Sequence, residues 1–361
     1  MPLPNAELIG LPAPSWLLQA LLVLTFSLHL VPMTLTVGGT ILALYAEAGA
    51  RLANDPSGYR QLARRLWRLL PPITSFTITL GVAPLLFIQL VYGKFFYPAS
   101  VLTAWSWFAV VPLLLVGYGM LYLQSMGSQD ARWRPWAALA AALSFVGVLA
   151  IYVSTMGLTT EPGLWRDMYA ASQGGGHWFM KLPRALHVLT GALAMGGGLT
   201  GLVGHLADDK RFGIFARRFG LIALTAGIVL AVPAGLWYMS TLPSTESVRM
   251  ALVGAACGLA AVGLLAYAVA GVKEPKPLLA WAGLTCLALA GVVLAVQRHL
   301  VRQAALAPNI TAADWKLQPQ WDVFAIFALL LVGTLGLIGY LFVRFLRASH
   351  AQERRLGHTA D

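Results

Sequence analysis

The chain has 361 residues, of which 58% are hydrophobic and only 11% are charged, and its formal net charge is +11. A composition this apolar excludes an ordinary soluble domain and is typical of a protein that crosses a membrane several times. The positive charge alone would favour a nucleic-acid partner, but the placement of the basic residues in alternate connections excludes that reading.

Nine apolar segments are long enough to cross a bilayer as helices. We therefore predict an all-α polytopic membrane protein with nine transmembrane helices. The predicted spans cover about 20–46, 72–93, 100–123, 136–158, 183–206, 219–241, 248–271, 278–300 and 321–345. Residues 1–361 are predicted to form a single integral membrane domain. It would consist of one repeat at about 16–158, a second at about 183–300 and an extra span at about 321–345.

The basic residues predict how the chain is oriented. Seventeen of the 25 Lys and Arg residues fall in alternate connections and in the C-terminal tail. Because cytoplasmic connections carry the excess of positive charge, this pattern predicts a periplasmic N-terminus and a cytoplasmic C-terminus. We expect a multi-pass protein of the bacterial inner membrane. No basic residue precedes the first apolar run, so a cleaved signal peptide is not expected.

The first span carries a polar stripe. His29, Met33, Thr36, Thr40 and Glu47 share one face of the expected helix. Polar side chains at this depth are costly in contact with lipid, so the stripe is predicted to face the interior of the bundle. Glu47 lies at the inner end of the span, and the cores of the other spans carry no carboxylate.

The fifth span carries two histidines, His187 and His205, which are 18 residues apart and therefore on the same helix face. The residues between them on that face are small: Gly191, Ala194, Gly198 and Gly201. Such a face can accommodate a flat cofactor headed by an imidazole. The alternative is close helix packing through small residues, with the histidine in a polar pocket.

A weak internal repeat relates the first span to the fifth. Gly38 and Gly39 follow His29 at the same distance at which Gly196 and Gly197 follow His187. A four-span unit repeated once keeps its orientation, so His29 and His187 are both expected in the outer half of the membrane. Parallel repeats of this kind place shared sites between the two halves.

Histidines on three spans make non-covalent haem the predicted cofactor. His29, His187 and His299 are candidate iron ligands at the outer side, and Met250 is a candidate alternative ligand. His205 is a weaker candidate, since no second histidine is expected at the inner side. The basic side chains at similar depth that could pair with haem propionates are Lys181, Arg184, Arg298 and Arg302. No C-x-x-C-H motif is present, so one or more b-type haems are expected rather than covalent haem.

Several segments, taken in order, resemble the large subunit (subunit I) of cytochrome bd quinol oxidase. They are "LTFSLHLVPMTLTVGGTILALYAE", "TLGVAPLLFIQLVYG" and "ALHVLTGALAMGGGLTGL" with the following "RFGIFARRFGL". In that family the histidine of the fifth span binds the low-spin b haem, which implies this role for His187. The family's eighth span ends in Glu-x-x-Arg-Gln-Pro-Trp, and its glutamate binds a haem. This sequence has His299-x-x-Arg302-Gln303, so His299 takes the place of that glutamate.

Departures from the family shape the functional prediction. The long outer quinol-binding loop is replaced by the short "LPSTES", and the glutamates of the third span are missing. We interpret these changes as loss of dioxygen reduction with retention of haem. The predicted function is that of a b-type cytochrome membrane subunit in a respiratory complex. It would pass electrons between membrane quinol and a periplasmic, multihaem c-type cytochrome.

Two alternatives remain open at this stage, and no catalytic residue is assigned. One alternative is a true bd-type quinol terminal oxidase that reduces dioxygen. The other is a haem-free quinone-binding anchor or transporter, in which the histidines serve polar packing. Quinone and membrane lipid are expected partners under each reading, and nucleic acid is not.

Overall fold

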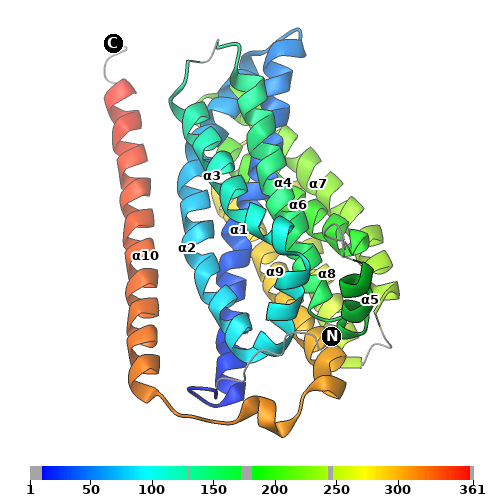
Figure 1. Ribbon diagram of the computed structural model, residues 1–361. Helices are drawn as coiled ribbons and strands as arrows, with labels where there is room; N and C mark the ends of the chain where they lie inside the picture. The colour runs from blue at the N-terminus through cyan, green and yellow to red at the C-terminus, as the bar shows by residue number, and fades with distance from the viewer. Residues whose placement is uncertain (1–9, 129–130, 172–180, 243–246, 358–361) are drawn as a thin grey trace. The chain divides into compact units, whose positions relative to one another are not determined.

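A computed structural model describes residues 10–128, 131–171, 181–242 and 247–357. Within these ranges the chain is helical and contains no β-strand. The α-helices are α1 (Ser15–Leu52), α2 (Ser57–Leu102), α3 (Ala104–Met126), α4 (Arg134–Leu158), α5 (Trp165–Ala171), α6 (Leu182–His205), α7 (Lys210–Ser240), α8 (Ser247–Ala270), α9 (Pro277–Leu306) and α10 (Trp321–Gly357) (Figure 1).

Among the described residues, nine helices are long and apolar enough to cross a membrane. Each of them overlaps one of the predicted spans over most of its length, so the all-α polytopic fold is confirmed. The short helix α5 belongs to the connection between α4 and α6. Large apolar side chains are exposed along the bundle, for example Phe108 on α3 and Leu265 on α8. This exposure is expected for surfaces that face lipid rather than water.

Two helices begin well before the predicted spans. The predicted second span starts near residue 72, whereas α2 begins at Ser57. The extension is stabilised by Leu62, Leu66 and Leu70, which recur every fourth residue and are fully buried. Similarly, α7 begins at Lys210, where the Asp209 side chain caps the helix by accepting hydrogen bonds from the first backbone amides. Basic residues that were expected in connections therefore lie on helices.

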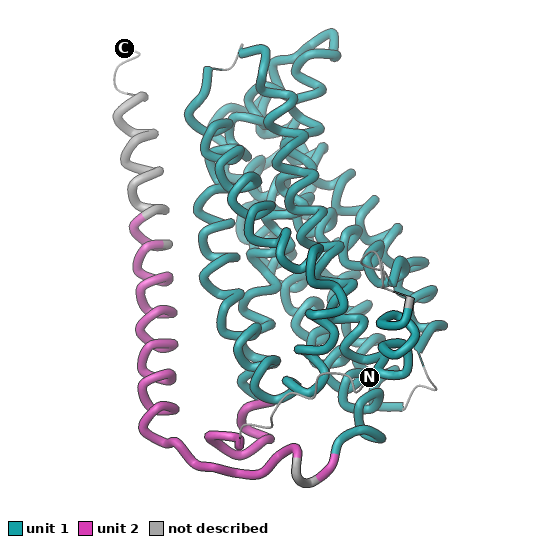
Figure 2. Tube along the Cα trace, viewed as in Figure 1, with its two compact units in different colours: residues 1–8, 20–310 teal, residues 9–19, 311–361 magenta. Residues whose placement is uncertain are grey.

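The chain divides into two compact units, one of residues 1–8 and 20–310 and the other of residues 9–19 and 311–361 (Figure 2). The first unit contains the bundle from α1 to α9, apart from the beginning of α1. In the second unit, Leu11 forms a parallel bridge with Leu317, and the backbone amide of Gln318 donates to the carbonyl oxygen of Leu11 at 2.8 Å. The single-domain organisation stays a prediction.

Helices α1 and α6 approach each other closely at glycines. A Cβ atom on Gly38 would overlap the backbone carbonyl of Ala192, and one on Gly196 would overlap the backbone of Gly38. The following glycines face the next helix of their own half, because Gly39 packs against Leu70 of α2 and Gly197 against Leu224 of α7. The two glycine pairs of the proposed repeat therefore make corresponding contacts, which supports the repeat.

Candidate functional site

His29 and His187 occupy matching positions in the two halves of the bundle, which are formed by α1–α4 and α6–α9. The Nδ1 atom of His29 lies 2.9 Å from the carbonyl oxygen of Thr77 on α2. The Nδ1 atom of His187 lies 3.0 Å from the carbonyl oxygen of Ala231 on α7. A carbonyl can only accept, so in both rings Nδ1 carries the proton and donates it. In a neutral ring with the proton on Nδ1, the Nε2 atom keeps its lone pair and is available to a metal ion.

A glycine lies against each of these imidazole rings. A Cβ atom on Gly81, one turn beyond Thr77, would lie 2.9 Å from Cε1 of His29. A Cβ atom on Gly235, one turn beyond Ala231, would lie 3.0 Å from Nδ1 of His187. These glycines have no side-chain functional group, and they were not predicted from the sequence. The only signal was their occurrence within otherwise apolar helical segments.

Three arginines predicted to hold propionates gather inside the bundle. Arg298 and Arg302 of α9 lie within electrostatic range of each other and of Arg184 on α6. The guanidinium of Arg298 stands 4.6 Å from the ring centroid of Phe26, and that of Arg302 stands 5.5 Å from the ring centroid of Tyr92. No ion pair found among the described residues includes these arginines. The cluster therefore carries positive charge that an anionic group could neutralise.

His299 differs from the other two candidate ligands. It lines a pocket between α1, α2, α4 and α9, and its buried Nδ1 atom has no hydrogen-bond partner among the described residues. The remaining polar lining consists of Tyr152, Arg298 and Arg302. The apolar lining consists of Leu22, Val23, Phe26, Pro84, Ile88, Met156 and Ala295. His299 thus lacks the second-shell acceptor that orients most metal-binding histidines.

Met250 and His205 have other surroundings. The Met250 side chain is 47% exposed, whereas the preceding Arg249 is buried. The structure therefore adds no support to Met250 as a ligand, which stays a prediction. His205 is buried, and its Nδ1 atom accepts a hydrogen bond from the backbone amide of Lys276 at 3.1 Å. This hydrogen bond links the end of α6 to the start of α9, so His205 has a structural role.

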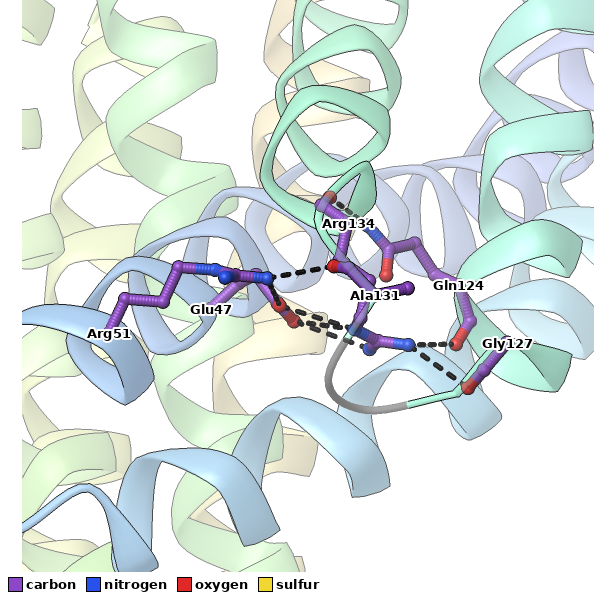
Figure 3. Close-up of polar contacts among 6 residues, drawn as sticks. All are labelled: Glu47, Arg51, Gln124, Gly127, Ala131 and Arg134. Carbon is purple, nitrogen blue, oxygen red and sulfur yellow. Dashed lines mark hydrogen bonds and ion pairs between the residues drawn. The ribbon is translucent and has the colours of Figure 1, made fainter.

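Glu47 forms the corresponding tie in the first half of the bundle (Figure 3). Arg134, at the start of α4, is fully buried and donates to both carboxylate oxygens of Glu47 at 3.2–3.3 Å. Arg134 also donates to the carbonyl oxygens of Gln124 and Gly127. Arg51 lies 3.6 Å from the same carboxylate and donates to the carbonyl of Ala131. Glu47 lies 18 residues after His29, and His205 lies 18 residues after His187. Glu47 thus links α1 to α4, and His205 links α6 to α9 in the same way.

The small-residue face of α6 has different surroundings near His187 and near His205. Gly198 and Gly201 pack against Tyr267, whose hydroxyl donates to the carbonyl oxygen of Gly198 at 2.6 Å. At Gly198 and Gly201 an aromatic side chain of α8 thus covers the face, as the alternative of close helix packing predicts. Gly191, one turn from His187, meets no atom within 4 Å of an added Cβ. Of the three glycines on this face, Gly191 is therefore the one with open space beside it.

The residues at the end of the bundle that carries His29 and His187 fit a haem. In each of the two imidazoles Nδ1 is hydrogen-bonded to a backbone carbonyl and Nε2 is left free, which is the arrangement expected of a histidine that would hold haem iron. Arg184, Arg298 and Arg302 supply cations for carboxylate groups. The open side of Gly191 leaves room near the ring of His187.

Comparisons with known proteins bear on the fold. No protein-family model matches the sequence, and no curated protein matches it. The structure is similar to a chain of the bd oxidase from Geobacillus thermodenitrificans, with a TM-score of 0.70 and 12% sequence identity. The similarity covers 94% of this chain and 99% of the oxidase chain. The predicted resemblance to cytochrome bd is therefore confirmed at the level of the fold. The chain is an integral membrane protein with a bd-oxidase-like fold.

Proposed function

We propose that this chain is the haem-binding membrane subunit of a respiratory oxidoreductase, passing electrons between membrane quinol and a periplasmic c-type cytochrome. The observation that carries the proposal is the pair of equivalent imidazoles, each with Nδ1 bound to a carbonyl and Nε2 available. The bd-oxidase-like fold supports a respiratory role, since the matched protein is an oxidase. Bound haem would supply one-electron transfer.

The residues have distinct parts in this proposal. His187 and His29 would each hold a haem through Nε2, and the backbone carbonyls of Ala231 and Thr77 fix the orientation of the rings. The clustered arginines Arg184, Arg298 and Arg302, the first and last of them buried, would neutralise propionates in a medium of low dielectric constant. His299 and Met250 stay predicted ligands without comparable support. The N-terminus and the haems would face the periplasmic side, as the distribution of basic residues predicts.

Reduction by quinol tests the electron-transfer role. We expect a short-chain quinol to reduce the haem of the purified protein, and an oxidised c-type cytochrome to reoxidise it within the same experiment. Stopped-flow absorbance at the haem bands measures both steps. A haem that is reduced by dithionite but is neither reduced by quinol nor reoxidised by a c-type cytochrome would contradict the proposed role.

A terminal oxidase is the second candidate, because the matched structure is a bd oxidase. Dioxygen reduction consumes protons, which carboxylates and histidines usually carry through a membrane protein. Among the described residues, Glu47 is the carboxylate inside the bundle, and it is bound to Arg134. This arrangement disfavours the oxidase. Quinol-dependent oxygen consumption by the purified protein would favour it.

Gly235 offers a test of the ring position. Changing Gly235→Ala should displace the imidazole of His187, because the new methyl carbon would lie 3.0 Å from Nδ1. We expect a shifted or weakened low-spin haem band in the reduced-minus-oxidised spectrum. Gly254→Ala is the matched control, since a Cβ atom there meets nothing within 4 Å. Identical spectra for the two variants would show that the ring of His187 does not hold iron in this position.

A further inference from the structure

The exposed face of α2 changes from charged to apolar along the helix. Near the start of α2 its exposed side chains include three arginines, Arg60, Arg64 and Arg68. Farther along they include three apolar side chains, Ile78, Val82 and Leu86. With about 3.6 residues per turn, the arginines and the apolar side chains lie within about 100° of one another around the helix. The dihedral angles of α2 depart from helical values only at Tyr92, beyond this face.

We propose that α2 and α3 together bind an anionic phospholipid, with its phosphate on the arginines and its acyl chains on the apolar stripe. Such a site goes beyond electron transfer and does not depend on haem. The packing of α2 keeps the arginines outside the bundle, because the opposite side of the helix is fully buried at Leu62, Leu66 and Leu70. The arginines therefore point toward the surroundings of the bundle, where a lipid headgroup can reach them.

The three arginines carry positive charge that no carboxylate neutralises within the described part of the chain. None of the ion pairs found there includes Arg60, Arg64 or Arg68. By contrast, Arg51 at the end of α1 is paired with Glu47. A guanidinium can bind a phosphate through two parallel hydrogen bonds, so these arginines suit a phosphodiester. The distribution of basic residues predicts that they lie at the cytoplasmic surface, where the leaflet is negatively charged.

Two tyrosines of α3 lie beside the point where the face of α2 changes from charged to apolar. Ser75 lies on this face between the arginines and the apolar side chains. The hydroxyl of Tyr118 donates to Oγ of Ser75 at 3.3 Å. The hydroxyl of Tyr122 lies 3.3 Å from that of Tyr118, and the two rings meet edge to face at a centroid distance of 5.0 Å. Tyrosines are typical of the headgroup level of a membrane, where a hydroxyl can donate to a lipid oxygen.

The apolar stripe continues onto α3, which is adjacent to α2 (Figure 1). Val111 and Leu115 are exposed and share a helix face with the two tyrosines. From Ser75 to Leu86, α2 rises by roughly 16 Å, which is about half of the ~30 Å hydrocarbon thickness of a bilayer. The stripe therefore has the length of one leaflet. Charge, hydroxyl and apolar surface follow one another in the order of the parts of a phospholipid, whereas a soluble anion would leave the stripe uncovered.

The start of α7 supplies a control with the same change of charge. Arg211 and Arg218 are exposed on α7, which corresponds to α2 in the second half of the bundle. We expect Arg64→Gln with Arg68→Gln to weaken binding of phosphatidylglycerol about 30-fold, because each juxtamembrane arginine contributes about fivefold. Arg211→Gln with Arg218→Gln should change the dissociation constant by less than about twofold. Native mass spectrometry of the full-length protein in a non-ionic detergent measures both. Equal weakening would show unspecific attraction of charge and overturn the proposal.

Removal of one hydroxyl tests the part played by α3. Tyr122→Phe should weaken binding of phosphatidylglycerol about fivefold, the size of one lost hydrogen bond. Tyr45→Phe, at an exposed tyrosine of α1, should leave binding unchanged. Both variants keep the aromatic ring and every arginine, and circular dichroism should show the helix content of the unchanged protein. If the two variants bind phosphatidylglycerol equally well, α3 takes no part and the proposed site is wrong.

Two competitors distinguish a phospholipid from other occupants of this face. An excess of glycerol 3-phosphate should not displace phosphatidylglycerol, because it has no acyl chains. Phosphatidylcholine should bind about tenfold more weakly, because its headgroup has no net charge. Displacement by glycerol 3-phosphate would indicate a site for a soluble phosphate. Equal binding of phosphatidylcholine would indicate an apolar surface that does not select charge, as would suit a protein helix. Either result would overturn the proposal.

Discussion

Purified protein carrying His187→Ala should lack a low-spin haem band and contain about one haem fewer per chain than the unchanged protein. The imidazole is oriented by the carbonyl oxygen of Ala231 and bordered by Gly235, so its removal takes away the ligand atom together with one hydrogen bond between α6 and α7. Optical spectra and haem quantification by pyridine haemochrome measure the loss.

His205→Ala is the control on the same helix. His205 binds the backbone amide of Lys276 and therefore serves the joint between α6 and α9. Its replacement should lower the free energy of unfolding by about 1 kcal/mol, as expected for one hydrogen bond, and leave the haem spectrum unchanged. If His187→Ala and His205→Ala give the same spectrum, His187 is not a haem ligand.

A second large effect is expected at the buried ion pair between Glu47 and Arg134. Arg134→Leu should destabilise the protein by about 3–5 kcal/mol, because it leaves the carboxylate of Glu47 buried without its main partner. Arg134 is fully buried and contacts both oxygens of that carboxylate, as Figure 3 shows. Reversible unfolding in mixed micelles measures the change in the free energy of unfolding.

Two further variants decide whether the pairing causes this effect. Arg132→Leu is the matched control, because Arg132 is exposed and lies two residues earlier, and its replacement should cost less than about 0.5 kcal/mol. The double variant Glu47→Leu with Arg134→Leu removes both charges and should recover much of the lost stability. A double variant at least as unstable as the sum of the single variants would contradict a specific ion pair.

Much of the architecture could be predicted from the sequence because membrane helices have a strong local signal. An apolar run of spanning length must be helical to satisfy its backbone in lipid, so nine such runs predicted nine helices. The offsets from His29 to Gly38 and from His187 to Gly196 likewise predicted equivalent positions. In the structure these glycines are the points at which α1 and α6 touch.

Long-range partners were not predictable in the same way. The acceptors for His29 and His187 are the backbone carbonyls of Thr77 and Ala231. Because every residue has a backbone carbonyl, the sequence does not show which one accepts. Arg134 precedes the predicted span at 136–158 and therefore counts among the basic residues of the connections, yet its partner Glu47 lies 87 residues away. Tyr267 likewise covers the inner face of α6 from a helix whose packing no local pattern reveals.

The central claim is that the two matched imidazoles hold haem. The most direct test is the reduced-minus-oxidised optical spectrum of the isolated protein, with haem quantified by pyridine haemochrome. The account predicts b-type haem with low-spin bands, part of which disappears in His187→Ala and another part in His29→Ala. Purified, folded protein without haem b would contradict the account and favour a haem-free membrane anchor or transporter.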